Sequence, residues 1–453
     1  MPIKLKKETR AQAPPKPGKS QGGKRGGVKY WLVTYGCTLN QSDSLAMKAV
    51  LSQNGCAEAA SEKDADVIII NSCTVKEATE NKIAYQLRRY SGMKKPIVLA
   101  GCMSVNEGLI FRNAPRASIV GTSAVGRIYD AVESALAHSK EIFTGFSPKD
   151  ALPHERKGPI AKIAIAEGCL SACTFCQTRL ARGKLYSYPI DSVVLEAKRW
   201  LEQGAIELQL TGQDTGAYGA EIRTNVAKLL EAVCAIDGDF KVRLGMANPE
   251  HVAKHLPEIL KAFENPKMYK FMHLPVQAGS NRVLKAMKRD YTVEGFEALV
   301  KALRAKYPGM SIATDIIVGF PTETEEEFEE TLALLRRVRF DVVNVSKFSP
   351  RPFTKAKEMR QVPKDAIKRR AEICSALCHE ITFSINSGFV GAKAGMVVTE
   401  RQRTMTGRDG NYRTIALPAG SPARIGDRLD VLVTEARATC LIGRPVGAGK
   451  PKK

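Results

Sequence analysis

The sequence has no run of apolar residues near the ~20 that a membrane-spanning helix requires. Its start, MPIKLKKETRAQAPPKPGKSQGGKRGG, lacks the apolar core of a secretory signal. We therefore expect a cytoplasmic protein with no membrane partner, in a compartment where thiols stay reduced. Under those conditions eleven cysteines, an odd number, favour metal ligation or catalysis over disulfide bonds.

Acidic residues are scarce beside basic ones. The chain has 47 Asp and Glu against 69 Lys and Arg, which gives a formal net charge of +22 at pH 7. This excess favours a phosphate-rich polymer as partner, although a solvated basic surface is the alternative. Residues 1–27 combine Lys, Gly and Pro with few large apolar side chains, so we expect a disordered basic arm there.

The 453 residues are enough for about three domains, and the patterns indicate an α/β protein. Over residues 28–140, strand-like apolar runs alternate with helical patterns, which predicts a parallel sheet covered by helices. Residues 138–159 are interpreted as a linker. Residues 155–387 contain six strand-like runs that predict a partial (β/α)6 barrel, closed by a helix over 364–387. Four short strands over 388–446 predict a small β-barrel.

A fourth cysteine is missing from EGCLSACTFCQ, residues 167–177, which carries only Cys169, Cys173 and Cys176. A structural zinc site or a fully ligated iron–sulfur cluster usually has four soft ligands. Three thiolates can hold three irons of a cubane cluster and leave the fourth iron open for a small molecule. The alternative is a zinc site completed by His154 or another distant ligand.

A second set of three cysteines ends strand-like runs near the start of the chain: VTYGC at Cys37, VIIINSC at Cys73 and IVLAGC at Cys102. Their intervals, 36 residues (37 to 73) and 29 residues (73 to 102), are near the ~30 of one β–α–β unit. The thiols should converge on one sheet edge and hold a second cluster with an open iron. Asn40 and Asn71 either orient these loops or form turns; three separately buried cysteines are the alternative.

The other cysteines are interpreted as packing residues. Two of them, Cys374 and Cys378, are spaced to share a helix face beside His379, where burial is favoured over a metal. The packing set is Cys56, Cys234, Cys374, Cys378 and Cys440.

The gaps of three and two residues, with Phe175 before the last cysteine, resemble the signature of the radical S-adenosylmethionine (SAM) superfamily. That resemblance implies that SAM chelates the open iron and that Phe175 lies beside its adenine. TGQDTGAYG, residues 211–219, then suits the edge that binds the SAM amino group, through Gly212, Gln213 and Asp214. HLPVQAGS, residues 273–280, adds Gln277 as a further predicted SAM contact.

The order of the three domains resembles the methylthiotransferase family, and the last barrel resembles the TRAM domain, an RNA-binding module. The resemblance covers residues from about 28 to 446. TRLARGKLYSYP and GMANPEH look most like the archaeal and eukaryotic branch, which acts on threonylcarbamoyl-modified adenosine beside the tRNA anticodon. The main motifs are TYGCTLNQSDS, NSCTVKEATENK, LAGCM, GCLSACTFCQTRLARG, LTGQDTGAYG, HLPVQAGSNRVLKAMKRDYT and DIIVGFPTETEEEF.

The family resemblance implies two [4Fe–4S] clusters and two SAM molecules per turnover. One cluster would cleave SAM to a radical that abstracts hydrogen from carbon 2 of adenine, and the other would deliver a methylated sulfur. The implied partners are the tRNA anticodon stem-loop and an external electron donor, and we expect a monomer. No side chain is assigned as catalytic in itself.

Three alternatives remain at this point: isopentenyl-modified adenosine in tRNA, an aspartate of a ribosomal protein, and a non-catalytic iron–sulfur protein that binds RNA or carries electrons. Open clusters disfavour an electron carrier. Arginines in the terminal barrel favour phosphate contacts and hence RNA. Arg182 could meet a carboxylate or phosphate, or be ordinary surface charge. The barrel arginines include Arg401, Arg403, Arg408, Arg413, Arg424, Arg428, Arg437 and Arg444.

Overall fold

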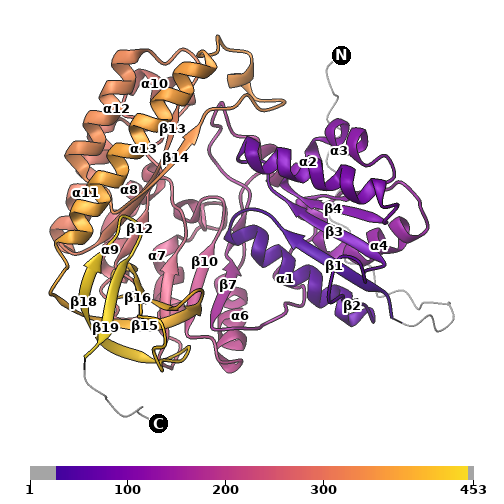
Figure 1. Cartoon of the computed structure of the whole chain (residues 1–453), viewed down its shortest axis with the longest axis horizontal. Coiled ribbons are helices and arrows are strands. Elements are labelled where there is room, and N and C mark those ends of the chain that lie inside the picture. Colours follow the sequence, from indigo (N-terminus) through magenta and orange to yellow (C-terminus); the bar gives the residue numbers. More distant parts are fainter. Residues whose placement is uncertain (1–26, 447–453) are drawn as a thin grey trace. The chain divides into compact units, whose positions relative to one another are not determined.

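The computed structural model describes residues 27–446, so the predicted basic arm lies outside the described residues except for residue 27. The described chain forms two compact units. The first comprises the chain up to Gly36, Asp43–Thr74 and Ala78–Glu155. The second comprises Cys37–Ser42, Val75–Glu77 and the chain from Arg156 onward. Each unit is described by itself, and Figure 1 labels its elements.

The first unit contains a six-stranded parallel sheet in the order β2-β1-β3-β4-β5-β6, which confirms the predicted α/β sheet. Every residue of β3 and of β4 is buried, as expected for strands covered on both faces. The strands are β1 (Lys29–Thr34), β2 (Ala57–Glu58), β3 (Val67–Ser72), β4 (Ile97–Gly101), β5 (Ser118–Val120) and β6 (Ile142–Phe143).

Helices cover both faces of this sheet. On one face, Met47 and Leu51 of α1 pack with Ile128 and Val132 of α4. On the other face, side chains of α2 and α3, among them Ile83, form a second buried cluster. The helices are α1 (Thr38–Gln53), α2 (Glu77–Gly92), α3 (Glu107–Asn113) and α4 (Ile128–Leu136).

The linker predicted over residues 138–159 is wrong in its first part, because β6 pairs with β5 and extends the sheet. The buried ring of Phe143 belongs to the apolar core on the α1 and α4 face. Further along, the ammonium of Lys149 forms a buried ion pair with Asp43 at 2.5 Å. Two apolar residues within a polar stretch are too short a run to show a strand period, so the sequence pattern missed them.

The second unit begins with six parallel strands, and all six strand-like runs of the sequence are confirmed. They form two sheets, in the orders β11-β10-β7 and β12-β13-β14, and a parallel bridge from Val242 to Met268 connects β11 to the segment before β12. Together they make the expected partial barrel. The strands are β7 (Ile160–Ala164), β10 (Glu207–Thr211), β11 (Lys241–Leu244), β12 (Phe271–His273), β13 (Ser311–Val318) and β14 (Val342–Lys347).

Helices follow the barrel strands, and local sequence signals fix their ends. Thr324 caps α12 through a capping box with Glu327, in which each side chain accepts from the backbone N–H of the other residue. The helix predicted over 364–387 is α13, Lys364–Ser387. The other helices are α6 (Ile190–Glu202), α7 (Val226–Cys234), α8 (Pro249–Lys254), α9 (Leu256–Ala262), α10 (Asn281–Met287), α11 (Val293–Lys306) and α12 (Glu325–Val338).

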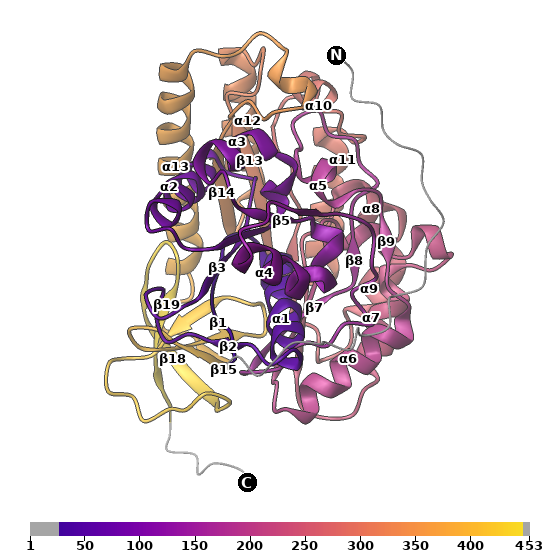
Figure 2. The same ribbon diagram turned by 90° about the vertical axis from the view of Figure 1, so that its right-hand side faces the viewer.

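The chain after α13 folds into a closed five-stranded barrel in the order β15-β16-β17-β19-β18. Four of these strands correspond to the predicted runs. The sequence pattern missed β16, MTGRD, because its polar and Gly residues indicate a turn. Figure 2 shows the barrel beside the carboxyl end of α13, where Asn386 donates to the carbonyl of Arg437 at 2.7 Å. The strands are β15 (Lys393–Arg401), β16 (Met405–Asp409), β17 (Thr414–Ala416), β18 (Arg428–Ala436) and β19 (Leu441–Pro445).

Within residues 27–446, no helix is both long enough and apolar enough to span a bilayer.

Candidate functional site

The three-cysteine loop follows the first barrel strand, and a short β-ribbon holds its two ends together. Strand β8 (Ala166–Glu167) pairs antiparallel with β9 (Tyr186–Ser187), and α5 (Thr178–Arg182) lies between the last cysteine and β9. Gly168 has φ +69°, and a Cβ there would lie 1.9 Å from the carbonyl oxygen of Lys184. Only glycine fits this position, and it lets the loop turn sharply just before Cys169.

The cysteines of the loop are partly buried. Burial, with a smaller contribution from the charge of Asp214, raises the pKa of the Cys169 thiol to about 12. Burial also raises the pKa of the Cys176 thiol. Both thiols stay protonated at neutral pH unless a metal displaces the proton, which is how soft thiolate ligands bind iron. Within residues 27–446, no three Cys, His, Asp or Glu side chains are already gathered into a metal-binding group.

Arg289, which the sequence reasoning missed, contacts this loop directly. One guanidinium nitrogen donates to the sulfur of Cys173 at 3.4 Å. The other end nitrogen donates to Asn248 Oδ1 and to the carbonyl of Pro275, each at 3.2 Å. The Nε–H of Arg289 donates to the hydroxyl oxygen of Tyr291 at 3.0 Å. A partly buried positive charge, held by these hydrogen bonds, therefore lies beside one predicted cluster ligand. The sequence around Arg289, MKRDYT, gives no sign that the cysteine loop contacts this residue.

Asp214, one of the predicted SAM contacts, is buried, and its carboxylate binds groups of the protein itself. Oδ1 accepts from the backbone N–H groups of Gly216 at 3.1 Å and Asn248 at 2.9 Å. Oδ2 lies 2.6 Å from His251 Nδ1. Asn248 in turn donates from Nδ2 to Ser171 Oγ, within the cysteine loop, at 2.9 Å. Asp214 thus connects the turn after β10 to the loop through Asn248.

Gln213, beside Asp214, has a different environment. Its Oε1 atom is buried and accepts no hydrogen bond from any described residue. A buried oxygen without a donor is costly, so such an atom commonly marks a ligand contact. The neighbouring Gly212 packs near the β8 backbone, since a Cβ there would lie 3.4 Å from the carbonyl oxygen of Ala166. This turn fits a ligand that offers a donor group, as the amino group of SAM does.

Gln277 and Phe175, the other two predicted SAM contacts, lie in ordered surroundings. Gln277 has φ +74°, a backbone conformation that residues other than glycine rarely adopt. Its N–H donates to Asp315 O and its carbonyl accepts from Ile317 N–H, each at 2.9 Å, so strand β13 holds it there. Strain of this kind is concentrated at ligand sites. The ring of Phe175 packs edge-on against Phe320 with centroids 6.4 Å apart.

The second set of cysteines follows three neighbouring strands. Cys37 lies just before α1, after β1; Cys73 follows β3 directly; and Cys102 follows β4 as the first residue of η1 (Cys102–Val105). Because β1, β3 and β4 are adjacent and parallel, all three positions fall at the carboxyl edge of one sheet. Cys37 is exposed, whereas Cys73 and Cys102 are buried.

Polar groups and one glycine tie the ends of β3 and β4 together at this edge. Ser72 Oγ accepts from the N–H of Met103 at 3.1 Å, and Asn71 donates to Ser44 Oγ at 2.8 Å. Gly101 has φ +88°, and a Cβ there would lie 2.4 Å from Asn71 Oδ1. The sequence predicts that Asn71 either orients the loops or forms a turn. Its buried hydrogen bond to Ser44 of α1 agrees with the first alternative.

Arg182 is a buried structural residue in this molecule. It donates to Glu167 Oε2 at 2.8 Å, so the carboxylate it meets is the protein's own. Its side chain is fully buried. The alternative of ordinary surface charge is therefore wrong.

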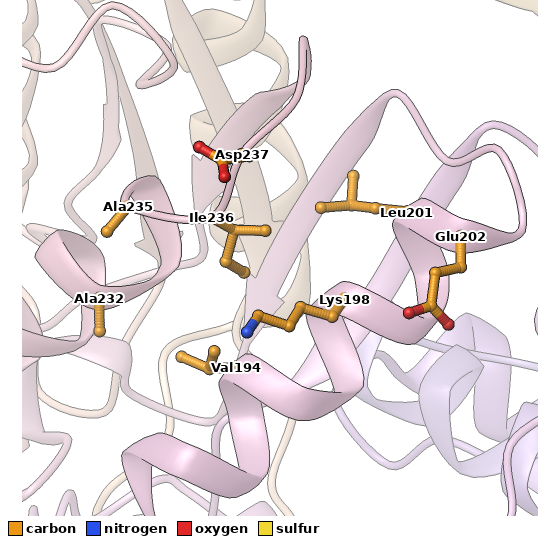
Figure 3. Close-up of a pocket in the computed structure, with 8 residues that line it drawn as sticks. All are labelled: Val194, Lys198, Leu201, Glu202, Ala232, Ala235, Ile236 and Asp237. Atoms are coloured by element: carbon orange, nitrogen blue, oxygen red, sulfur yellow. The ribbon is translucent and has the colours of Figure 1, made fainter.

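A surface hollow of about 420 Å³ lies between α6 and α7, and no residue of the two cysteine sets lines it (Figure 3). In Figure 3 the Lys198 side chain reaches across it toward Ile236, with Val194 below. Most of the other residues around it are aliphatic or small. The hollow offers no group of ligands or catalytic side chains, and we assign it no function.

Parts of the chain match three family models. Residues 163–335 match the Radical SAM superfamily, residues 29–121 match Uncharacterized protein family UPF0004, and residues 398–446 match the TRAM domain. The first match covers the cysteine loop, the end of β7 and all of β10, β11, β12 and β13. Fold, loop and match together define the class: the chain is a radical SAM enzyme.

Whole-chain relatives give the family. A protein of Pyrococcus horikoshii described as probable threonylcarbamoyladenosine tRNA methylthiotransferase is 39% identical over 425 residues, 92% of this chain and 99% of the relative. The threonylcarbamoyladenosine tRNA methylthiotransferase of Homo sapiens is 36% identical over 443 residues, 93% of this chain and 75% of the relative. The chain belongs to the methylthiotransferase family of radical SAM enzymes. This membership contradicts the non-catalytic alternative.

Solved structures agree with the fold. The radical SAM methyltransferase TsrM from Kitasatospora setae aligns with a TM-score of 0.52 at 14% identity, over 83% of this chain and 79% of that chain. The cobalamin-dependent radical SAM enzyme OxsB aligns with a TM-score of 0.51 at 13% identity, over 77% and 56% of the two chains. At these identities the likeness concerns the fold alone.

Proposed function

We propose that this enzyme inserts a methylthio group at carbon 2 of threonylcarbamoyl-modified adenosine next to the anticodon of tRNA. The observation that carries the proposal is the 39% identity with a relative of that described activity, over 92% of this chain. The three-cysteine loop after the first barrel strand supports the radical part of the chemistry. The TRAM match over residues 398–446 supports RNA as the substrate class.

In this proposal Cys169, Cys173 and Cys176 hold a [4Fe–4S] cluster, which family membership implies together with SAM. When bound, that cluster supplies the electron that cleaves SAM. The loop fits the group: it carries three thiols between the two strands of one β-ribbon, and Arg289 donates to the sulfur of one of them. The chain's own task is to hold these thiols, orient SAM and exclude water from a reactive radical.

The same proposal assigns SAM binding to Phe175, Gly212, Gln213, Asp214 and Gln277. Gln213 would use its buried, unpaired Oε1 to accept from the SAM amino group. Asp214 would contribute indirectly, since its carboxylate already fixes the backbone around this turn. Phe175 would offer its ring to the adenine, and the strained Gln277 a backbone held in place by β13.

We assign Cys37, Cys73 and Cys102 to a second [4Fe–4S] cluster, which when bound would supply an open iron for the sulfur to be transferred. Three thiols at one carboxyl edge of a parallel sheet are a donor set suited to such a cluster. The protein orients this edge through Asn71 and Ser72. The use of two SAM molecules per turnover belongs to the same proposal.

Recognition of the RNA would fall to the terminal barrel. Four of its eight arginines are exposed and form no ion pair with any residue in 27–446: Arg401, Arg403, Arg424 and Arg444. The other four are held by carboxylates, for example Arg428 by Asp239 at 2.5 Å. The unpaired group is available for phosphate contacts.

The proposal also includes a cytoplasmic location, an external electron donor and a monomeric enzyme. A radical SAM enzyme needs one electron for each SAM that it cleaves. Among residues 27–446 we find no redox group other than the two cysteine sets, so in this proposal the electron comes from an external donor. Transfer RNA as substrate agrees with the cytoplasm.

The test is mass spectrometry of tRNA nucleosides after anaerobic incubation of the reconstituted enzyme with SAM and reductant. We expect the threonylcarbamoyl nucleoside to gain the mass of a methylthio group. The Cys173→Ala variant is the control and should give no product. A product on isopentenyl-modified adenosine alone, or on a ribosomal-protein aspartate alone, would reject the assigned substrate.

A further inference from the structure

A second cavity, of about 460 Å³, lies within the second unit between three parts of the chain. It is lined by Arg243 of β11, by both ends of β12, by the amino-terminal halves of β13 and β14, by the last turns of α13, and by the terminal barrel. The cysteine loop lies at the carboxyl ends of the parallel strands, so this cavity is at the other end of the barrel. Its size is within the ~300–1,000 Å³ usual for ligand sites.

Three buried polar atoms of residues that line this cavity have no hydrogen-bond partner among the described residues: Ser311 Oγ, Arg243 Nε and Arg413 Nε. Ser311 is only 2% exposed, and its Oγ is buried without a hydrogen bond. Ser311 and Ala313 are two residues apart on β13, so they share a strand face, and both line the cavity. The Nε of Arg243, on β11, is also buried without an acceptor. A buried donor left unpaired is destabilising, and a ligand that accepts from it would remove this penalty.

Arg243 also lacks an ion-pair partner. Its guanidinium lies over the rings of Phe271 and Tyr412, 5.2 Å from each centroid, and no carboxylate among residues 27–446 forms an ion pair with it. The two neighbouring arginines differ. Arg408 lies 3.7 Å from Glu400, and Arg413 lies 3.4 Å from Asp341. Arg243 is therefore the arginine of this cavity that forms no ion pair with a described residue.

The groups that line the cavity define the chemistry of its ligand. A cation and a hydroxyl that both lack an acceptor suit an oxyanion with more than one oxygen. Exposed His379 and Thr439 lie at the same cavity, so it can be reached from solvent. We propose that this cavity is a phosphate-binding subsite in which Arg243 and Ser311 hold the phosphate oxygens.

The backbone of the RNA is the source that the surroundings favour. The cavity is lined partly by β16–β17 and the turn before β19, which belong to the TRAM-matching segment. This choice of source rests on the proposed function. A free phosphate or a mononucleotide offers the same group, and the experiment distinguishes the two.

The test uses the full chain and three variants of the cavity. Arg243→Gln removes the charge, Arg243→Lys keeps it, and Ser311→Ala removes the hydroxyl. Arg437→Gln is the matched control, because this exposed arginine of the same barrel pairs with Glu435 outside the cavity. Thermal unfolding of each variant checks the fold. Fluorescence anisotropy then measures the dissociation constant of a labelled tRNA transcript across a series of KCl concentrations.

For RNA as source, Arg243→Gln should weaken binding about tenfold and reduce the slope of log K against log salt by about one. Arg243→Lys should keep the slope, and Ser311→Ala should weaken binding about threefold without changing it. For a free ligand as source, inorganic phosphate or adenosine monophosphate should bind the wild type without RNA. That binding should be lost in Arg243→Gln, with RNA affinity unchanged in all variants.

The proposal is overturned if the cavity variants match Arg437→Gln in RNA affinity and salt slope and if neither phosphate probe binds the wild type. That outcome leaves the proposed function intact when the methylthio nucleoside still forms. Conversely, a missing product together with phosphate binding that depends on Arg243 would reject the proposed function and keep the subsite.

Discussion

At the scale of single residues, the candidate site depends on side chains that support the cysteines as much as on the cysteines themselves. Arg289 joins the sulfur of Cys173, the amide of Asn248 and the backbone before Gln277 in one network. Burial acts to lower the pKa of its guanidinium, but nearby Tyr291 and Cys173 outweigh burial and raise the pKa overall. The group is therefore a permanent positive charge at this position.

Replacing Arg289 with Gln should lower the midpoint potential of the cluster held by the loop, by on the order of tens of millivolts, because a nearby positive charge stabilises the reduced form. A redox titration followed by electron paramagnetic resonance measures this shift. Arg289→Lys should retain most of the potential. Arg282→Gln, which removes a half-exposed arginine paired with Glu327, is the control and should leave it unchanged. Equal potentials in all three variants would show that the contact does not tune the cluster.

The two sets of cysteines should differ in what their loss abolishes. We expect Cys173→Ala to stop SAM cleavage, measured as 5′-deoxyadenosine, by at least ~100-fold, because an incomplete ligand set loses metal affinity. Cys73→Ala should still cleave SAM but form no methylthio product. Cys234→Ala, a buried cysteine outside both sets, is the control. Equal loss of cleavage in both variants would disprove the division of labour.

At the scale of secondary structure elements, most of the fold follows from local pattern. The fully buried VIIINS and IVLAG runs identified central parallel strands, and the period of residues 364–387 gave α13. The elements that were missed, β6 and β16, are held by their neighbours. Strand β16 pairs with β15 and β17, and its Gly407 fits closely against Val397, where a Cβ would lie 2.0 Å from the carbonyl oxygen. Such strands have no apolar alternation of their own.

The terminal barrel allows a test of which arginines meet RNA. Replacing the unpaired Arg401 and Arg403 with Gln should weaken tRNA binding and lower its salt slope by about one for each phosphate that the barrel no longer binds. The matched control replaces Arg428 and Arg437, which are already paired with Asp239 and Glu435. Anisotropy titrations at several salt concentrations measure both double variants. A larger effect in the control pair would move the RNA surface to another face of the barrel.

At the scale of the whole molecule, the described chain carries two cysteine sets on two different α/β frameworks. One set lies in a single loop of the barrel, and the other is spread over 66 residue positions, from 37 to 102, on neighbouring strands. A scan for short cysteine motifs finds the first set and misses the second. The second set becomes visible only when each cysteine is seen to end a strand of a parallel sheet.

Anaerobic reconstitution of the whole chain should therefore give about eight irons per molecule, since each [4Fe–4S] cluster contributes four. Colorimetric iron and sulfide analysis measures this number. Replacing Cys37, Cys73 and Cys102 together should reduce it to about four and leave SAM cleavage in place. About four irons in the wild type would remove the second cluster from the proposal.

The sequence alone determined the class of this protein: the spacing of Cys169, Cys173 and Cys176, the six strand-like runs and the order of domains all follow from local pattern. Tertiary structure alone decided which side chains support them. The contact of Arg289 with Cys173, 116 positions apart, and the cavity shared by Arg243 and Ser311 depend on how distant segments pack. The physical reason is that periodicity reports which face of an element is buried, whereas hydrogen bonds between elements depend on distances that no local pattern encodes.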